Sequence, residues 1–262
     1  MRDSKNLRLS EITCEHYEDL IGRIGDDYIE YRWKRNPVSF SHYRHTQKSV
    51  EFAFSSIDAP VLYLLEIGSG PGTWTDICLQ HTKSLTIIDI SSEMLNLVRK
   101  RFHDVSLNLL CGDFLADTIA LPHSFDIIFS ARAIEYMDDK GAMVAKSVQH
   151  LNPGGYLIII TKNPNWMDKR RDSKTFDKSR VKDIHYDWIS WSAMEGYYRS
   201  QGLTQVTTYP VCLGSYYQPL KNKVGIKICD LIQGLIYRKK ISPRLDFLAE
   251  SYMTIGRKIY KG

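Results

Sequence analysis

Several features of disulfide-stapled, metal-binding and membrane proteins are missing from this chain of 262 residues. Its five cysteines form no CxxC pair, so their spacing fits neither a zinc site nor a disulfide framework. No run approaches the roughly 18 apolar residues of a membrane span, and the charged N-terminus lacks the apolar stretch of a secretion signal. With 43% hydrophobic and 25% charged residues, we expect a cytoplasmic globular protein with reduced thiols and no bound metal.

A strong overall charge is also absent, but the charge is unevenly distributed. The formal net charge is +5, whereas residues 169–182 and 221–244 each contain seven Lys or Arg residues against two and one acidic residues. A basic C-terminal half is compatible with contacts to phosphates, to an anionic lipid surface or to RNA, and equally with a plain solvated face.

Apolar, strand-like segments alternate with helical segments through the middle of the chain. Strands are expected at 61–68, 84–91, 106–113, 124–131 and 156–162, with helices at 76–82, 92–102 and 141–151. This alternation indicates a parallel sheet covered by helices on both faces. Further helices at 190–203 and 224–237 and strands at 204–211 and 251–259 bring the expected total to seven strands.

Two helical segments precede this pattern. They cover residues 11–34 and 41–56 and are interrupted around Pro37. We expect residues 1–56 to form a helical lid. Residues 57–262 would then form the main domain, with a basic and aromatic insert at about 163–189.

A glycine-rich turn follows the first expected strand in LLEIGSGPGTWT, residues 64–75. Glycines let a ligand approach the backbone, and the next helix offers free N–H groups at its start. The turn lacks the lysine of a P-loop, and Gly72 comes one position early for a GxGxxG dinucleotide pattern. Glu66 before Gly68 instead suits a ligand with an ammonium group and no pyrophosphate. Asp89, at the end of the second strand, lies where a carboxylate can bind ribose hydroxyls. The alternative for the glycine-rich turn is a purely structural role.

Five motifs occur in order: LEIGSGPG, IIDIS, CGDF, FDIIFSARAIEYM and LNPGGYLIII. Together they resemble the motifs of class I S-adenosylmethionine-dependent methyltransferases, strongly over about residues 40–165 and more loosely over 185–260. The resemblance implies an α/β fold with a Rossmann-like, seven-stranded, mostly parallel sheet, an antiparallel last strand and helices on both faces. It also implies S-adenosyl-L-methionine as the cofactor.

The resemblance assigns roles to matching residues. The glycine loop and Glu66 would surround the methionine part of the cofactor, and Asp89 would hold the ribose hydroxyls. Asp113 would accept the adenine amino group, although it also suits a plain turn. The expected cofactor-binding residues are Tyr43, Arg44, Glu66, Gly68, Ser69, Gly70, Gly72, Asp89, Ile90, Met94, Asp113, Phe114, Ser130 and Ala131.

Two further roles are left with alternatives. Related quinone-pathway O-methyltransferases use an arginine near this lid to hold the cofactor carboxylate; Arg44 is the candidate, with Arg32 and Arg35 as rivals. The catalytic candidates are His42, Glu135 and Tyr136. Because the cofactor's sulfonium is already activated, alignment of the acceptor alone can supply much of the rate enhancement, and a general base is not required.

The acceptor is expected to be a small molecule methylated at oxygen or nitrogen, a class that includes lipid-linked and phosphorylated molecules. The SARA sequence after the fourth strand differs from the [DNS]PP[YF] motif of enzymes that methylate nucleobase amines, so no nucleic-acid partner is expected. An RNA or protein methyltransferase and a non-catalytic cofactor-binding subunit are the alternatives. The oligomeric state is left open. Helix 224–237, followed by Arg238-Lys239-Lys240, is expected to pack on the sheet, with peripheral membrane contact as the alternative.

Overall fold

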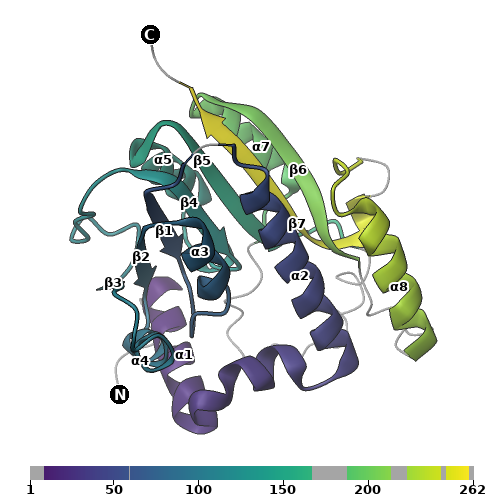
Figure 1. Cartoon of the computed structure of the whole chain (residues 1–262), viewed down its shortest axis with the longest axis horizontal. Coiled ribbons are helices and arrows are strands. Elements are labelled where there is room, and N and C mark those ends of the chain that lie inside the picture. The colour runs from purple at the N-terminus through teal and green to yellow at the C-terminus, as the bar shows by residue number, and fades with distance from the viewer. Residues whose placement is uncertain (1–8, 59, 167–187, 214–222, 243–245, 260–262) are drawn as a thin grey trace.

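The computed structural model describes residues 9–58, 60–166, 188–213, 223–242 and 246–259. Its centre is one sheet of seven strands in the order β3-β2-β1-β4-β5-β7-β6 (Figure 1). The strands are β1 (Tyr63–Ile67), β2 (Ser84–Asp89), β3 (Asn108–Cys111), β4 (Phe125–Ala131), β5 (Leu151–Lys162), β6 (Leu203–Leu213) and β7 (Ala249–Lys258). The first five pair in parallel, and β7 runs antiparallel to both of its neighbours. The predicted mostly parallel sheet with an antiparallel last strand is confirmed.

Helices cover both faces of the sheet. They are α3 (Thr75–His81), α4 (Ser92–Arg101), α5 (Lys140–Gln149), α7 (Trp191–Ser200) and α8 (Lys223–Ile236), with short helices η3 (Ile134–Tyr136) and η5 (Asp246–Leu248). Neighbouring residues of a strand point to opposite faces, so Leu64 packs in the core beneath α3 and α4, and Leu65 in the core beneath α5 and α7. None of the helices in the described ranges combines the length and hydropathy needed to cross a bilayer.

The N-terminal segment is helical, as expected, but its interruption lies elsewhere. It consists of α1 (Leu9–Ile24), η1 (Gly25–Asp27), the π-helix η2 (Glu30–Lys34) and α2 (Pro37–Ser55). Pro37 was expected inside a break ending near residue 41, but it is the first residue of α2. Asn36 caps the helix, because its side chain accepts a hydrogen bond from the Ser39 N–H at 2.9 Å. Proline is well suited to this first position, where its missing N–H costs nothing.

Candidate active site

A cavity of about 820 Å³ lies at the C-terminal ends of β1, β2 and β4. In the order of the strands, β2 and β3 lie on one side of β1, and β4 and β5 lie on the other. The cavity therefore sits where the strand order reverses. This is the usual ligand position in an open parallel sheet. The opposite wall comes from α1 to η2, the purple segment that runs along this end of the sheet in Figure 1.

The glycine loop forms the floor of this cavity. Gly68, Gly70 and Gly72 all have positive φ, at +70°, +54° and +78°, which other residues adopt only with strain. A Cβ at Gly68 would stand 2.2 Å from the Cβ of Ala133, whereas a Cβ at Gly70 would meet nothing within 4 Å. Gly68 is therefore required by the protein's own packing, and Gly70 leaves open space toward the cavity.

Asp89 connects the end of β2 to the glycine loop. Its carboxylate accepts the Gly70 N–H at 2.8 Å and the Ser91 N–H at 3.0 Å. Burial raises the pKa of Asp89 to about 6, and the hydrogen bonds from Ser91 and Gly70 offset only part of that effect. Since the residue also lines the cavity, it presents a carboxylate of fixed orientation to any ligand there.

Most of the predicted site residues line the same cavity. They are Gly68, Ser69, Gly70, Asp89, Ile90, Met94, Asp113, Phe114, Ala131, Glu135 and Tyr136. Asp113 also accepts the Leu115 N–H at 2.9 Å, so it has the turn role that the sequence left as its alternative.

Other predicted residues lie behind the wall. Glu66 is buried and accepts a hydrogen bond from the Thr75 hydroxyl at 2.7 Å. Ser130 donates to the Ile67 carbonyl at 3.0 Å. Tyr43 stacks on Trp74, which does line the cavity, with ring centroids 5.3 Å apart. Gly72 packs close to Phe102. These four residues support the site without lining it.

Arg44 does not reach the cavity. It forms an ion pair with Asp230 of α8, and Ser41 and His45 contact the same carboxylate at 2.5 and 3.0 Å. The rotation of α2 against α8 thus turns Arg44 toward α8 rather than toward the cavity. The two rivals, Arg32 and Arg35, line the cavity instead.

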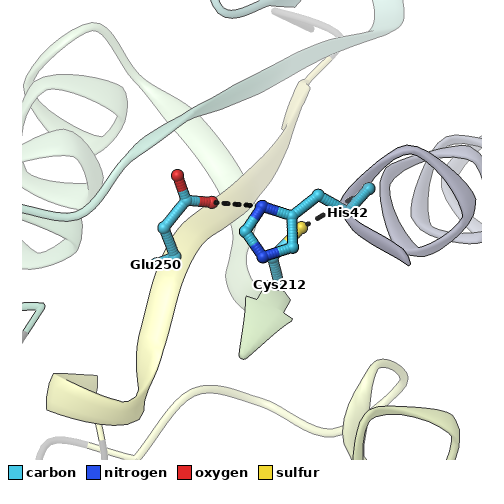
Figure 2. Close-up of side chains that lie close together, drawn as sticks. All are labelled: His42, Cys212 and Glu250. Carbon is cyan, nitrogen blue, oxygen red and sulfur yellow. Dashed lines mark hydrogen bonds and ion pairs between the residues drawn. The ribbon is translucent and has the colours of Figure 1, made fainter. Parts of the chain in front are cut away.

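His42 is also turned away from the cavity. It is buried with Cys212 and Glu250 (Figure 2), and its Nδ1 lies 3.8 Å from a Glu250 oxygen. Burial lowers the pKa of His42 and raises that of the Cys212 thiol to about 12. Although burial opposes ionisation of Glu250, Lys162 and Arg132 hold its pKa well below the usual range.

His42, Cys212 and Glu250 are the one group of potential metal ligands found within the described ranges. Lys162, at 3.2 Å, and Arg132, at 3.8 Å, already neutralise the Glu250 carboxylate. The thiol stays protonated near neutral pH. This charge balance does not suit a divalent cation.

The remaining catalytic candidates line the cavity but have other partners. One oxygen of Glu135 accepts the Lys162 N–H at 2.9 Å and the Thr161 hydroxyl at 3.1 Å, and lies 3.2 Å from Nε of Arg132. The Tyr136 hydroxyl accepts a hydrogen bond from the Tyr17 hydroxyl at 2.7 Å. Burial raises the pKa of Tyr136 well above the usual value. One Glu135 oxygen and the Tyr136 hydroxyl are therefore engaged within the protein.

Several cavity residues were not predicted from the sequence, among them His16, Arg132 and Lys162. His16 of α1 is the only histidine in the described part of the cavity wall; burial and Arg23 lower its pKa, so it is neutral near pH 7. Arg132 and Lys162 extend the wall beyond β4 and β5. Arg132 has a φ of +66°, rare for a residue with a side chain and frequent at functional sites. No motif in the sequence of α1 marks His16 as a residue of the cavity wall.

The insert predicted at 163–189 is described only at its two ends. Trp166 and Trp188 line the cavity, and the Lys162 ammonium lies 4.9 Å from the ring centre of Trp188. The other aromatic residues of the insert lie outside the described residues; they are Phe176, His185 and Tyr186.

Comparison with known proteins identifies the domain around this cavity. Residues 65–159 match the family described as "Methyltransferase domain". A malonyl-[acyl-carrier protein] O-methyltransferase of Priestia megaterium is 24% identical over 145 residues, 53% of this chain and 52% of that protein. A ubiquinone biosynthesis O-methyltransferase of Rhodopseudomonas palustris is 28% identical over 109 residues, 40% of this chain and 41% of that protein. The chain thus spans about half the length of the curated relatives it matches, or less.

A solved structure extends the likeness to nearly the whole fold. The N-methyltransferase NodS of Bradyrhizobium japonicum, in complex with S-adenosyl-L-homocysteine, aligns with a TM-score of 0.59 at 18% identity. The alignment covers 94% of this chain and 98% of that one. The sequence match over residues 65–159 and the order of the seven strands thus make this chain similar to class I S-adenosylmethionine-dependent methyltransferases.

Proposed function

We propose that this protein binds S-adenosyl-L-methionine in the cavity and transfers its methyl group to oxygen or nitrogen of a small molecule. One observation carries the proposal: the Asp89 carboxylate is fixed at the end of β2 by the N–H of Gly70, and both residues line the cavity. A carboxylate in this position is suited to two neighbouring ribose hydroxyls.

The residues of the cavity fit the cofactor. The open space over Gly70 is where a ligand can approach the backbone, since a Cβ there would meet nothing within 4 Å. Ile90 and Phe114 offer apolar surface for a purine, and Asp113 offers an acceptor for its amino group. Arg32 or Arg35, rather than Arg44, is in reach of a carboxylate bound in the cavity.

Residues 1–56 are proposed as the lid over this site, and residues 57–262 as the cofactor-binding domain. Support comes from the cavity wall, to which α1 contributes His16 and Tyr17 and the segment through η2 contributes Arg32 and Trp33. The lid is tied to the domain by the Tyr17–Tyr136 hydrogen bond and by Cys14, whose thiol donates to the Ile90 carbonyl at 3.4 Å. A cover of this kind excludes water from the reacting groups.

When bound, S-adenosyl-L-methionine supplies an electrophilic methyl group on a positively charged sulfur. The chain's own contribution is then to hold the acceptor in line and to keep water out, which can be worth roughly 7–11 kcal/mol. Because Glu135 and Tyr136 are held by other partners, we assign them to shaping the wall rather than to proton removal. His16 also lines the cavity, and its lowered pKa leaves the imidazole neutral near pH 7.

The far wall of the cavity bears on the acceptor class. Trp166 and Trp188 bring flat apolar surface there, while the charges of Arg132 and Lys162 are balanced by Glu135 and Glu250. A small acceptor with a flat apolar part suits such a wall, including one carried on a lipid. The curated relatives named above are, by their names, an O-methyltransferase of malonyl-[acyl-carrier protein] and an O-methyltransferase of ubiquinone biosynthesis, so acceptors differ among the relatives.

Two measurements test this function. Calorimetry with S-adenosyl-L-homocysteine should give micromolar binding, and a metabolite screen with methyl-labelled cofactor should yield a labelled small molecule. Binding without transfer to any tested acceptor, restored by a second protein, would favour the non-catalytic subunit. Labelling of tRNA or protein instead of metabolites would favour the macromolecular alternative. Absence of cofactor binding would refute the proposal altogether.

A further inference from the structure

Helix α8 is fixed to the protein by one face only. Its inner face contains Ile226 and Gln233, which are buried against α2 and β6. The Gln233 side chain donates to the backbone carbonyls of Pro210 and Val211 at 3.2 and 2.7 Å. Asp230 is held by α2, as described above. These polar contacts set the rotation of α8 about its own axis, so its outer face is equally defined.

The outer face is a continuous apolar stripe. Its members are separated by three or four positions and are between 43% and 68% exposed: Val224, Ile228, Leu231, Ile232 and Leu235. Single exposed apolar residues are ordinary, but five on one helix face form a patch that marks an interaction surface. A helix that is apolar on both faces is normally covered on both. Figure 1 shows α8 at the periphery of the molecule, outside α2.

The charges around the stripe are positive. Lys227 is exposed and directly precedes Ile228 of the stripe. Lys239 and Lys240 are exposed just beyond the C-terminal end of the helix. The only acidic residue of α8 is Asp230, which faces α2 and is neutralised by Arg44. A second copy of the chain would bring these lysines close to their own counterparts, which is unfavourable, whereas an anionic surface complements them.

We propose that the outer face of α8 docks on the surface of an anionic lipid bilayer. The helix would lie in the interface, with Leu231 and Leu235 among the acyl chains and Lys227 at the level of the headgroups. Its 14 residues are too few to cross the hydrocarbon core, so the contact is peripheral. The proposal concerns a surface separate from the cavity and does not depend on methyl transfer.

The test is co-sedimentation of the full-length protein with lipid vesicles. Vesicles containing phosphatidylglycerol should retain the protein, and vesicles of phosphatidylcholine alone should not. The double variant Leu231→Glu/Leu235→Glu should lose at least about tenfold in partitioning, since it places charge at the interface. Val105→Glu is the matched control, because Val105 is an exposed apolar residue beside β3, at the opposite edge of the sheet, and should bind normally.

A second variant keeps the test decisive if the first is poorly folded by circular dichroism. Lys227→Glu/Lys239→Glu leaves the stripe intact and should weaken binding to the anionic vesicles, as should added salt. The proposal is overturned if the wild-type protein stays in solution with anionic vesicles, or if both α8 variants bind as the wild type does. A dimer in sedimentation equilibrium that Leu231→Glu/Leu235→Glu dissociates, without any vesicle binding, would assign the face to a second copy instead.

Discussion

Replacement of Asp89 by asparagine should weaken cofactor binding without unfolding the protein. The carboxylate accepts the backbone N–H groups of Gly70 and Ser91, and the residue lines the cavity. Asparagine keeps one acceptor oxygen but loses the charge and turns the second acceptor into a donor. The loss corresponds to about one charge-assisted hydrogen bond, roughly 2–3 kcal/mol, or about 30- to 150-fold in affinity for S-adenosyl-L-homocysteine.

The pH dependence sharpens this prediction. Since the pKa of Asp89 is raised to about 6, its ionised form dominates above pH 6 and its protonated form below. Only the ionised form accepts both hydroxyls, so wild-type affinity should fall by up to about tenfold per pH unit below pH 6. Asp89→Asn should lack this component of the pH dependence.

Calorimetric titrations at pH 5, 6 and 8 measure both effects. Asp117→Asn is the matched control, because Asp117 is exposed and is not among the cavity residues. Thermal unfolding of each variant checks that the fold is kept. Equal affinity of wild type and Asp89→Asn at pH 8, with the same pH profile, would refute the role of Asp89 as the ribose ligand.

Four further predictions follow from the same residues. Gly70→Ala should weaken S-adenosyl-L-homocysteine binding in calorimetry and lower the melting temperature less than Gly68→Ala does. Both alanines have the strain of a positive φ, and only the one at position 68 also approaches Ala133 to 2.2 Å; the reverse pattern would exclude this division of roles. Burial raises the pKa of Glu66 from 4.5 to about 7, so the folded protein binds this proton more tightly than the unfolded chain does. The wild type should therefore lose up to about 3 kcal/mol of stability as the pH rises from 4.5 through 7. In urea unfolding, Glu66→Gln should lose less stability between pH 5 and pH 8, and identical losses would contradict the assignment. Arg44→Ala should reduce stability slightly and leave cofactor affinity unchanged, whereas Arg32→Ala should weaken cofactor binding several-fold. The opposite order of affinities in calorimetry would make Arg44 a cofactor-binding residue. His16→Gln should lower turnover of an identified acceptor by roughly 10²-fold or more if His16 removes a proton, and by only a few-fold if alignment dominates; we expect the smaller effect, and a large loss with unchanged cofactor affinity would show that a base is required.

The parts of the site that lie within short motifs could be predicted from the sequence. Gly68, Gly70 and Asp89 are positioned by the ends of two adjacent strands, and the geometry of a parallel sheet brings such ends together. The serine pair Ser91-Ser92 likewise marks the start of α4 in the sequence, and in the structure Ser91 is the cap, since its hydroxyl accepts the Met94 N–H at 3.3 Å.

The residues contributed by the N-terminal helices could not be assigned in the same way. Whether Arg44 or Arg32 faces the cavity depends on where α2 begins and how it is rotated, and the Asp230 contact that fixes this rotation lies 186 positions away in the sequence. His42 was expected to be a catalytic residue of the lid, but it lies in the core, beside Glu250 of the last strand. Long-range packing of this kind leaves no periodic pattern in the sequence.

The exposed stripe of α8 shows the same division. The amphipathic character of residues 224–237 was evident, and the structure shows that this helix does pack on the protein. The sequence did not reveal that the buried face is the one containing Gln233 and Asp230, because both are polar. They are satisfied by the carbonyls of β6 and by the side chains of α2, and the more apolar face is left outside.

The most direct test of the proposed function is a crystal structure of the protein with S-adenosyl-L-homocysteine. The ribose hydroxyls should bind the Asp89 carboxylate, the adenine should lie between Ile90 and Phe114, and the homocysteine should cross the open face of Gly70. A ligand bound elsewhere, or a cavity that stays free of ligand at millimolar concentration, would contradict the account.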